Sequence, residues 1–100
     1  MTIDDVQIQL TTLYWSSKPG PIRDQITQIK HDVNRLSDSA LAMDISNRTE
    51  NFSNLAAMFD KSIIISIQNL VNSIKDDIEY ANQVNNTLGI LEKLVSSVPL

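Results

Sequence analysis

Residues 21–45 read PIRDQITQIKHDVNRLSDSALAMDI, and this stretch decides the fold class. Its apolar side chains alternate at spacings of four and three residues, which is a seven-residue repeat over three heptads. The repeat consists of Ile22, Ile26, Ile29, Val33, Leu36, Ala40 and Met43. Charged residues such as Arg23 and Asp32 occupy positions between them. We therefore predict a helix over 22–45, about 36 Å long, with a coiled-coil-like apolar seam.

The segment before this helix ends at a Pro-Gly-Pro turn, residues 19–21, which cannot lie inside a helix. Upstream, the apolar spacing fits a helix over 2–15 with Thr2 and Asp5 as its N-terminal cap. Residues 6–10 also alternate as a strand does. A lone strand in a helical chain has no pairing partner unless another molecule supplies one. We favour the helix over 2–15.

Downstream of the heptads the apolar periodicity is interrupted over residues 45–51. Asn47 and Glu50 have the spacing of a capping box, which favours a turn followed by a new helix. A continuous helix is the alternative, because no Gly or Pro interrupts this stretch. The stripe then resumes with a mean spacing near that of a helix. It predicts one long helix over 48–88 and a short helical turn over 90–97.

The small number of turn-forming residues also favours an all-α fold. The chain of 100 residues contains two glycines and three prolines. A β domain needs a turn signal about every 8–12 residues, which this composition does not supply. We predict a single all-α domain over 1–100, built as an elongated helical hairpin or coiled-coil-like bundle with a short N-terminal helix.

The unequal lengths of the two main helices predict a partner. Taken straight from residue 50, the second helix would be about 58 Å long, so a hairpin would cover it only to about residue 74. An apolar stripe left in water favours association. We therefore predict a homo-oligomer or a complex with another helical protein. The predicted interface on the continuing apolar stripe is Ile74, Ile78, Ala81, Val84, Leu88 and Leu91.

Trp15 completes this predicted interface. It is the single tryptophan, and it lies just before the Pro-Gly-Pro turn. At a helix end it can cap the apolar core or project outward as an anchor, and tryptophans are enriched among interface hot spots. We favour the capping interpretation over the anchor.

The sequence contains no pattern of residues typical of catalysis. His31 is the only histidine and lies opposite the apolar seam, and the chain has no cysteine. Asp76, Asp77 and Glu79 are most simply a solvated helix face, because adjacent helical residues point in different directions. No Gly-rich phosphate loop or nucleophile–base pair is present. We predict no catalytic, cofactor or metal site, no small-molecule substrate and no enzymatic activity.

The charge and hydropathy of the sequence argue against nucleic acid as a partner and against a membrane span. The net charge is −4, and the eight basic residues are spread singly, without the concentrated basic face that nucleic acids require. The acidic N-terminus, MTIDDVQIQL, lacks the apolar core of a cleavable signal peptide. The most apolar stretch, residues 63–71, is too short to span a bilayer. The sequence does not define a localisation.

These features favour a structural or assembly protein that oligomerises or docks onto another helical protein through its apolar heptad stripes. A second interpretation is a small secreted helical-hairpin protein or its export partner, since the chain is similar in size and architecture to substrates of the type VII secretion pathway. That family carries a Trp-x-Gly turn between its helices, whereas Trp15 and Gly20 have a different spacing and position. A third is a small regulatory protein that presents one helix to a target groove.

Overall fold

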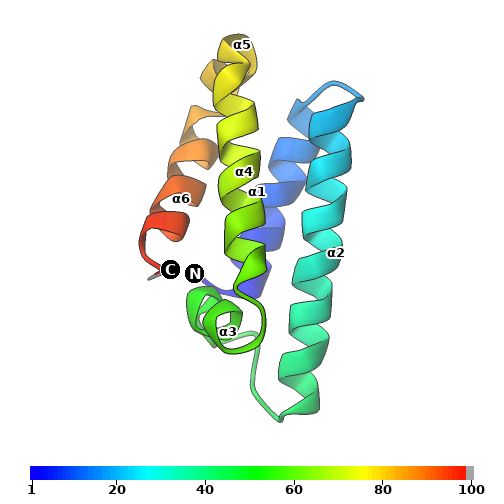
Figure 1. Cartoon of the computed structure of the whole chain (residues 1–100), viewed down its shortest axis with the longest axis vertical. Coiled ribbons are helices and arrows are strands. Elements are labelled where there is room, and N and C mark those ends of the chain that lie inside the picture. The colour runs from blue at the N-terminus through cyan, green and yellow to red at the C-terminus, as the bar shows by residue number, and fades with distance from the viewer. Residues whose placement is uncertain (99–100) are drawn as a thin grey trace.

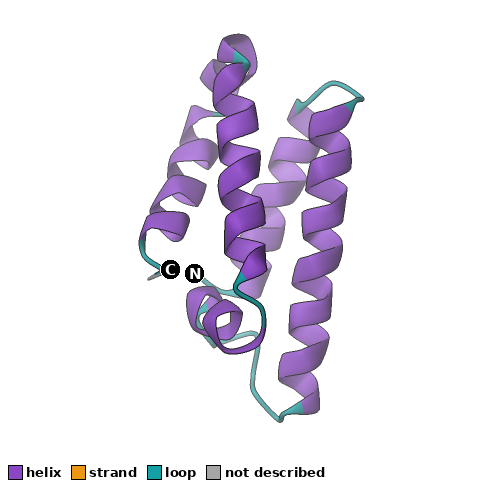
Figure 2. Cartoon of the chain, viewed as in Figure 1, coloured by secondary structure: helices purple, strands orange, loops and turns teal. Residues whose placement is uncertain are grey.

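The computed structural model describes residues 1–98, and within that range the protein contains six helices and no strand (Figures 1 and 2). The predicted all-α class is therefore confirmed. The helices are α1 (Ile3–Ser16), α2 (Pro21–Ala42), α3 (Phe52–Phe59), α4 (Ser62–Asp76), α5 (Ile78–Gln83) and α6 (Asn85–Ser96).

The helices form a bundle rather than a two-helix hairpin. α1 and α2 run antiparallel, α4 contacts α2 and α6, and α6 also contacts α1. α3 lies across the lower end in Figure 1, and α5 forms the upper end. The bundle measures 42 × 25 × 20 Å with a radius of gyration of 13.1 Å, near the value of about 13 Å expected for a compact chain of 100 residues. The predicted elongated hairpin is not confirmed.

The N-terminal segment is a helix, because its cap is complete. The Asp5 backbone N–H donates to the Thr2 hydroxyl at 3.3 Å, and the Thr2 N–H donates to the Asp5 carboxylate at 2.9 Å. This reciprocal pair satisfies two backbone donors of the first turn. The hydrogen bond from the Thr2 backbone also lowers the pKa of the Asp5 carboxyl. The helix predicted over 2–15 corresponds to α1, and the strand alternative does not occur.

α2 corresponds to the heptad helix predicted over 22–45, but its seam is used inside the chain. Pro21 occupies the first turn, where its missing N–H is not needed. The central seam residues are buried against the same core as α1 and α4; they are Ile26, Ile29, Val33, Leu36 and Ala40. Met43 is exposed because the helix ends at Ala42. The heptads therefore belong to a globular core rather than to an extended coiled coil.

The end of α2 contains a strained residue. Asp44 has a φ of 58°, in the left-handed region. The N–H of Ile45 donates to the carbonyl of Ala40 at 2.9 Å, and that of Asp44 to the carbonyl of Leu41 at 3.1 Å. This is a Schellman-type helix end, where glycine is the favoured residue.

Asp44→Gly should therefore raise the free energy of unfolding by about 0.5–1 kcal/mol. Left-handed backbone costs an L-residue about 1–2 kcal/mol, and the extra freedom of glycine in the unfolded chain offsets about 0.4–1 kcal/mol of that gain. Urea denaturation measures the change. Asp44→Ala, which keeps the strain, serves as the control, and equal stability of the Gly and Ala variants would contradict the assignment.

The long helix predicted over 48–88 is wrong, because the chain breaks after α3, α4 and α5, and aspartate side chains cap the first two of these breaks. The Asp60 carboxylate accepts the Ser62 N–H at 3.0 Å, between α3 and α4. Asp77 separates α4 from α5, and its carboxylate accepts the Tyr80 N–H at 3.0 Å. Such local bonds offer the backbone an alternative to continuing the helix. Each break turns the chain without any Gly or Pro.

As a result, α6 runs back along α4, and the carboxylate of the half-buried Glu92 forms an ion pair with Lys75 at 2.7 Å. The turn predicted over 90–97 is part of α6. The predicted interface stripe is mostly covered by the chain itself: Ile74, Val84, Leu88 and Leu91 are buried, Ala81 packs partly buried against the core, and only Ile78 is exposed. The expectation that this stripe lies uncovered is therefore wrong.

Candidate functional site

α1 presents apolar side chains on both of its sides. Its inner side, with Val6, Leu10 and Leu13, is fully buried in the core. On the opposite side Ile8 is 60% exposed and Trp15 is 72% exposed. These two residues are seven positions apart, so they project from the same face to within about 20°. We call the exposed residues Asp4, Ile8, Thr12 and Trp15 the outer face of α1.

Trp15 is exposed, yet its ring contacts two neighbours. The ring of Tyr14 meets it edge-on, with ring centroids 5.1 Å apart. The guanidinium of Arg23, from the first turn of α2, lies 5.6 Å from the Trp15 ring centroid and 4.8 Å from that of Tyr14. The interpretation that Trp15 caps the core is therefore wrong. The tryptophan projects into solvent in a defined position.

Three side chains donate hydrogen bonds to the backbone carbonyls at the end of α1 that carries Trp15. The Arg23 Nε donates to the Tyr14 carbonyl at 3.0 Å, and the Ser17 hydroxyl donates to the same carbonyl at 2.8 Å. The hydroxyl of buried Tyr80, on α5, donates to the Leu13 carbonyl at 2.5 Å. A cation at a helix C-terminus also interacts favourably with the helix dipole. These bonds fix the end of α1 to α2 and α5.

Tyr80 makes the stability of these contacts depend on pH. Burial raises the pKa of its hydroxyl above the usual value, although the nearby positive charge of Arg23 opposes the shift. A raised pKa in the folded state means that the contribution of Tyr80 to stability is fully present below about pH 10. It is lost as the pH rises further, because the unfolded tyrosine ionises first.

Tyr80→Phe should lower the free energy of unfolding by about 1 kcal/mol at pH 7, the usual contribution of one hydrogen bond. Between about pH 9 and 11 the variant should lose less stability than the wild type, because it lacks the ionising group. Urea denaturation at a series of pH values measures both effects. Parallel losses in the two proteins over this range would contradict the assigned role of Tyr80.

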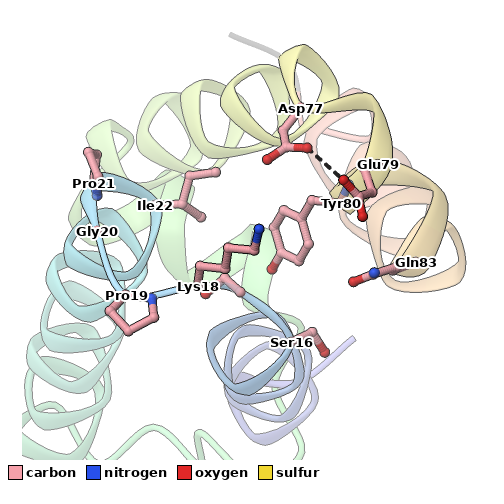
Figure 3. Close-up of a pocket in the computed structure, with 11 residues that line it drawn as sticks. Ser16, Lys18, Pro19, Gly20, Pro21, Ile22, Asp77, Glu79, Tyr80 and Gln83 are labelled. Atoms are coloured by element: carbon pink, nitrogen blue, oxygen red, sulfur yellow. Dashed lines mark hydrogen bonds between the residues drawn. The ribbon is translucent and has the colours of Figure 1, made fainter.

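A hollow of about 210 Å³ lies beside Tyr80, between the α1–α2 turn and the α4–α5 junction (Figure 3). The side chain of Lys18 points into it toward Tyr80, and Asp77 and Glu79 line the opposite side. The hollow is open to solvent, and these three charged residues are exposed. The Asp77 carboxylate is already engaged as the cap of α5. We assign no ligand to the hollow.

The other polar candidates lie apart from any enclosed site. His31 is exposed on α2, and Asp76, Asp77 and Glu79 are exposed around the α4–α5 junction. Within residues 1–98, no group of three or more histidine, aspartate or glutamate side chains is placed to hold a metal ion. None of the six described helices is both long enough and apolar enough to cross a membrane.

The contacts at the C-terminal end of α1 include two residues that sequence reasoning did not single out. Arg23 follows the Pro-Gly-Pro turn by two residues, and a tight turn brings the first turn of α2 next to the end of α1, so sequence carried a signal for it. Tyr80 lies 67 positions from Leu13, and no local pattern indicates that contact.

Comparisons of the chain with protein-family models, with curated proteins and with solved structures find no match. The function is therefore inferred from the geometry described above.

Proposed function

We propose that this protein is a non-enzymatic assembly module that associates with another helical surface through the outer face of α1. The observation that carries the proposal is the exposed but fixed position of Trp15, held by Tyr14 and Arg23. Tryptophan, tyrosine and arginine are the residues most enriched at interface hot spots. An anchor that is already ordered loses little conformational entropy when it binds.

The size of the exposed apolar surface fits a reversible association. A tryptophan side chain buries about 150–250 Å², so covering the exposed part of Trp15 is worth roughly 3 kcal/mol at about 25 cal/mol per Å². Covering Ile8 adds about 1–2 kcal/mol on the same scale. Together these terms are comparable with the lower range of association costs, about 4 kcal/mol. The affinity therefore depends on the polar groups around the two side chains as well.

The alternatives have less support. The secreted helical-hairpin interpretation rests on two main helices, and a bundle of six helices does not favour it. The regulatory-protein interpretation expects helicity gained on binding, whereas α1 is already packed and capped at both ends. Self-association through the 74–91 stripe is no longer supported, because most of that stripe is buried within the chain.

Site-specific photo-cross-linking in the cells that produce the protein tests the proposal. A photoreactive residue in place of Thr12, on the outer face of α1, should give a discrete adduct. Excess unlabelled wild-type chain should suppress that adduct, and the Trp15→Ala chain should not. The matched control is the same residue in place of His31, which is exposed on α2. No adduct at position 12, or equal adducts at both positions, would contradict the proposal.

A further inference from the structure

We infer that the partner of the outer face of α1 is a second copy of this chain, paired with the first through antiparallel α1 helices about a two-fold axis. The inference rests on the proposed function and names the partner. It follows from the order of charged and apolar groups along the helix. Asp4 lies at the N-terminal end of the face, Ile8 near its middle, and Trp15 with the Arg23 guanidinium at its C-terminal end.

This order makes the face complementary to itself. An acidic group at one end and a cation at the other require a partner with the reverse polarity, and the same face turned end for end has that polarity. A two-fold interface brings each contact together twice. The outer face carries the Asp4 carboxylate, and the Arg23 guanidinium of α2 lies beside its other end, so one negative and one positive group flank the apolar contact.

The spacing along α1 allows these contacts to form together. Asp4 and Trp15 are eleven residues apart, which is about 16.5 Å along a helix and about three full turns. When two such helices pair antiparallel, Asp4 of each copy reaches Trp15 and the Arg23 guanidinium of the other. Ile8 of each copy then lies beside Thr11 and Thr12 of the other, close to the two-fold axis. Antiparallel helix dipoles favour the same arrangement.

The charged groups of the face are available for this pairing. Within residues 1–98 the only ion pairs are Arg35 with Asp32 and Lys75 with Glu92, so neither Asp4 nor Arg23 has an ionic partner among these residues. Arg23 uses its Nε on the Tyr14 carbonyl, and this fixes the guanidinium over the aromatic rings. A carboxylate that approaches there contacts the cation and the indole together.

The other large apolar side chains that are exposed lie apart from α1, with Leu41 and Met43 at the end of α2, Met58 on α3, Ile65 on α4 and Ile78 on α5. Met58 is 64% exposed, close to the value for Ile8, so it offers a matched control for substitutions on the outer face.

Light scattering and sedimentation of the purified full chain over a concentration series test the inference. The mass should rise from that of the 11.2 kDa monomer to twice that value. Emission from Trp15, the only tryptophan, should shift to shorter wavelength over the same range as its ring leaves water. Ile8→Glu should raise the dissociation constant of the dimer at least tenfold, whereas Met58→Glu should leave it unchanged.

A charge exchange tests the antiparallel register. Asp4→Arg and Arg23→Glu should each weaken self-association, because each places like charges opposite one another. An equimolar mixture of the two variants should restore a dimer. One contact of the mixed dimer then pairs the introduced guanidinium with the introduced carboxylate, and the other contact keeps the original Asp4 and Arg23.

Circular dichroism verifies that each variant is folded. Should Arg23→Glu fail to fold, the comparison of Ile8→Glu with Met58→Glu still decides between the outcomes. A monomeric mass up to about 1 mM, or equal effects of Ile8→Glu and Met58→Glu, would overturn the inference.

The experiments distinguish failure of the proposed assembly role from failure of the inferred dimer. A monomeric chain that nevertheless cross-links from position 12 to a different protein would reject the second copy and keep the assembly role. A monomer with no adduct at position 12 would reject both.

Discussion

Leu91→Ala should lower the free energy of unfolding by about 2–5 kcal/mol, the usual range for leucine truncation in a core. Leu91 is fully buried, and α6 packs against α4 and α1. Truncation leaves a cavity that the surrounding helices fill only in part. A loss of this size is a large fraction of the roughly 5–15 kcal/mol that typically stabilises a domain. Urea denaturation of the purified variant measures it.

The control for this substitution is Ile78→Ala, a change of similar size in the same part of the chain. Ile78 is 74% exposed on α5, and its truncation should change stability by no more than about 0.5 kcal/mol. Neither variant should change the dissociation constant of the dimer beyond what its loss of folded chain explains. Loss of association with unchanged stability in Leu91→Ala would show that this stripe contacts another chain.

Phe52→Ala should destabilise the fold by about 3–5 kcal/mol, the usual range for a buried phenylalanine. Phe52 is fully buried at the start of α3, the helix that lies across the lower end of the bundle (Figure 1). Its backbone N–H donates to the Met1 carbonyl at 2.7 Å, so the residue also joins α3 to the N-terminal segment. In thermal unfolding, each kcal/mol lowers Tm by about 4–8 °C for a domain of this size.

Two companion substitutions separate cavity formation from a general effect on α3. Phe52→Leu keeps most of the apolar volume and should cost clearly less than Phe52→Ala. Met58→Ala, on the exposed side of the same helix, should stay within about 0.5 kcal/mol of the wild type. Equal losses in all three variants would mean that α3 does not pack as described.

The helix class and the first two helices were predictable because their signals are local. The Thr2–Asp5 capping box lies at the start of α1, and Pro21 lies in the first turn of α2. The heptad positions between Ile26 and Ala40 are buried, as a regular apolar stripe predicts. These features depend only on neighbours within one or two helical turns.

The path of the second half was not predictable from the same periodicity. α4, α5 and α6 each turn an apolar side toward one shared core, so the spacing of apolar residues continues across the breaks. Asp60 and Asp77 carry the signal for the first two breaks, since each accepts a hydrogen bond from a nearby backbone N–H, whereas the break at Val84 has no side-chain cap. An aspartate without a neighbouring Gly or Pro also occurs on solvated helix faces, and the pattern alone does not distinguish the two cases.

The candidate site was predictable only in part. The position of Trp15 before a tight turn identifies it as a residue at a helix end. Its exposure depends on how that end is closed, and closure uses Arg23 across the turn and Tyr80 from the distant α5. The other predicted interface residues depend on a long helix left uncovered. Once α6 folds back, the core takes up most of that stripe and the outer face of α1 remains.

Cross-linking between α4 and α6 tests most directly whether the chain closes its own core and leaves α1 for contact. The chain has no cysteine, so Lys75→Cys with Glu92→Cys introduces a unique pair at the positions of an ion pair of 2.7 Å. A short bismaleimide should link the two thiols within single chains at every protein concentration. In a continuous helix the sites would be about 25 Å apart. Linked dimers without linked monomers would contradict the account.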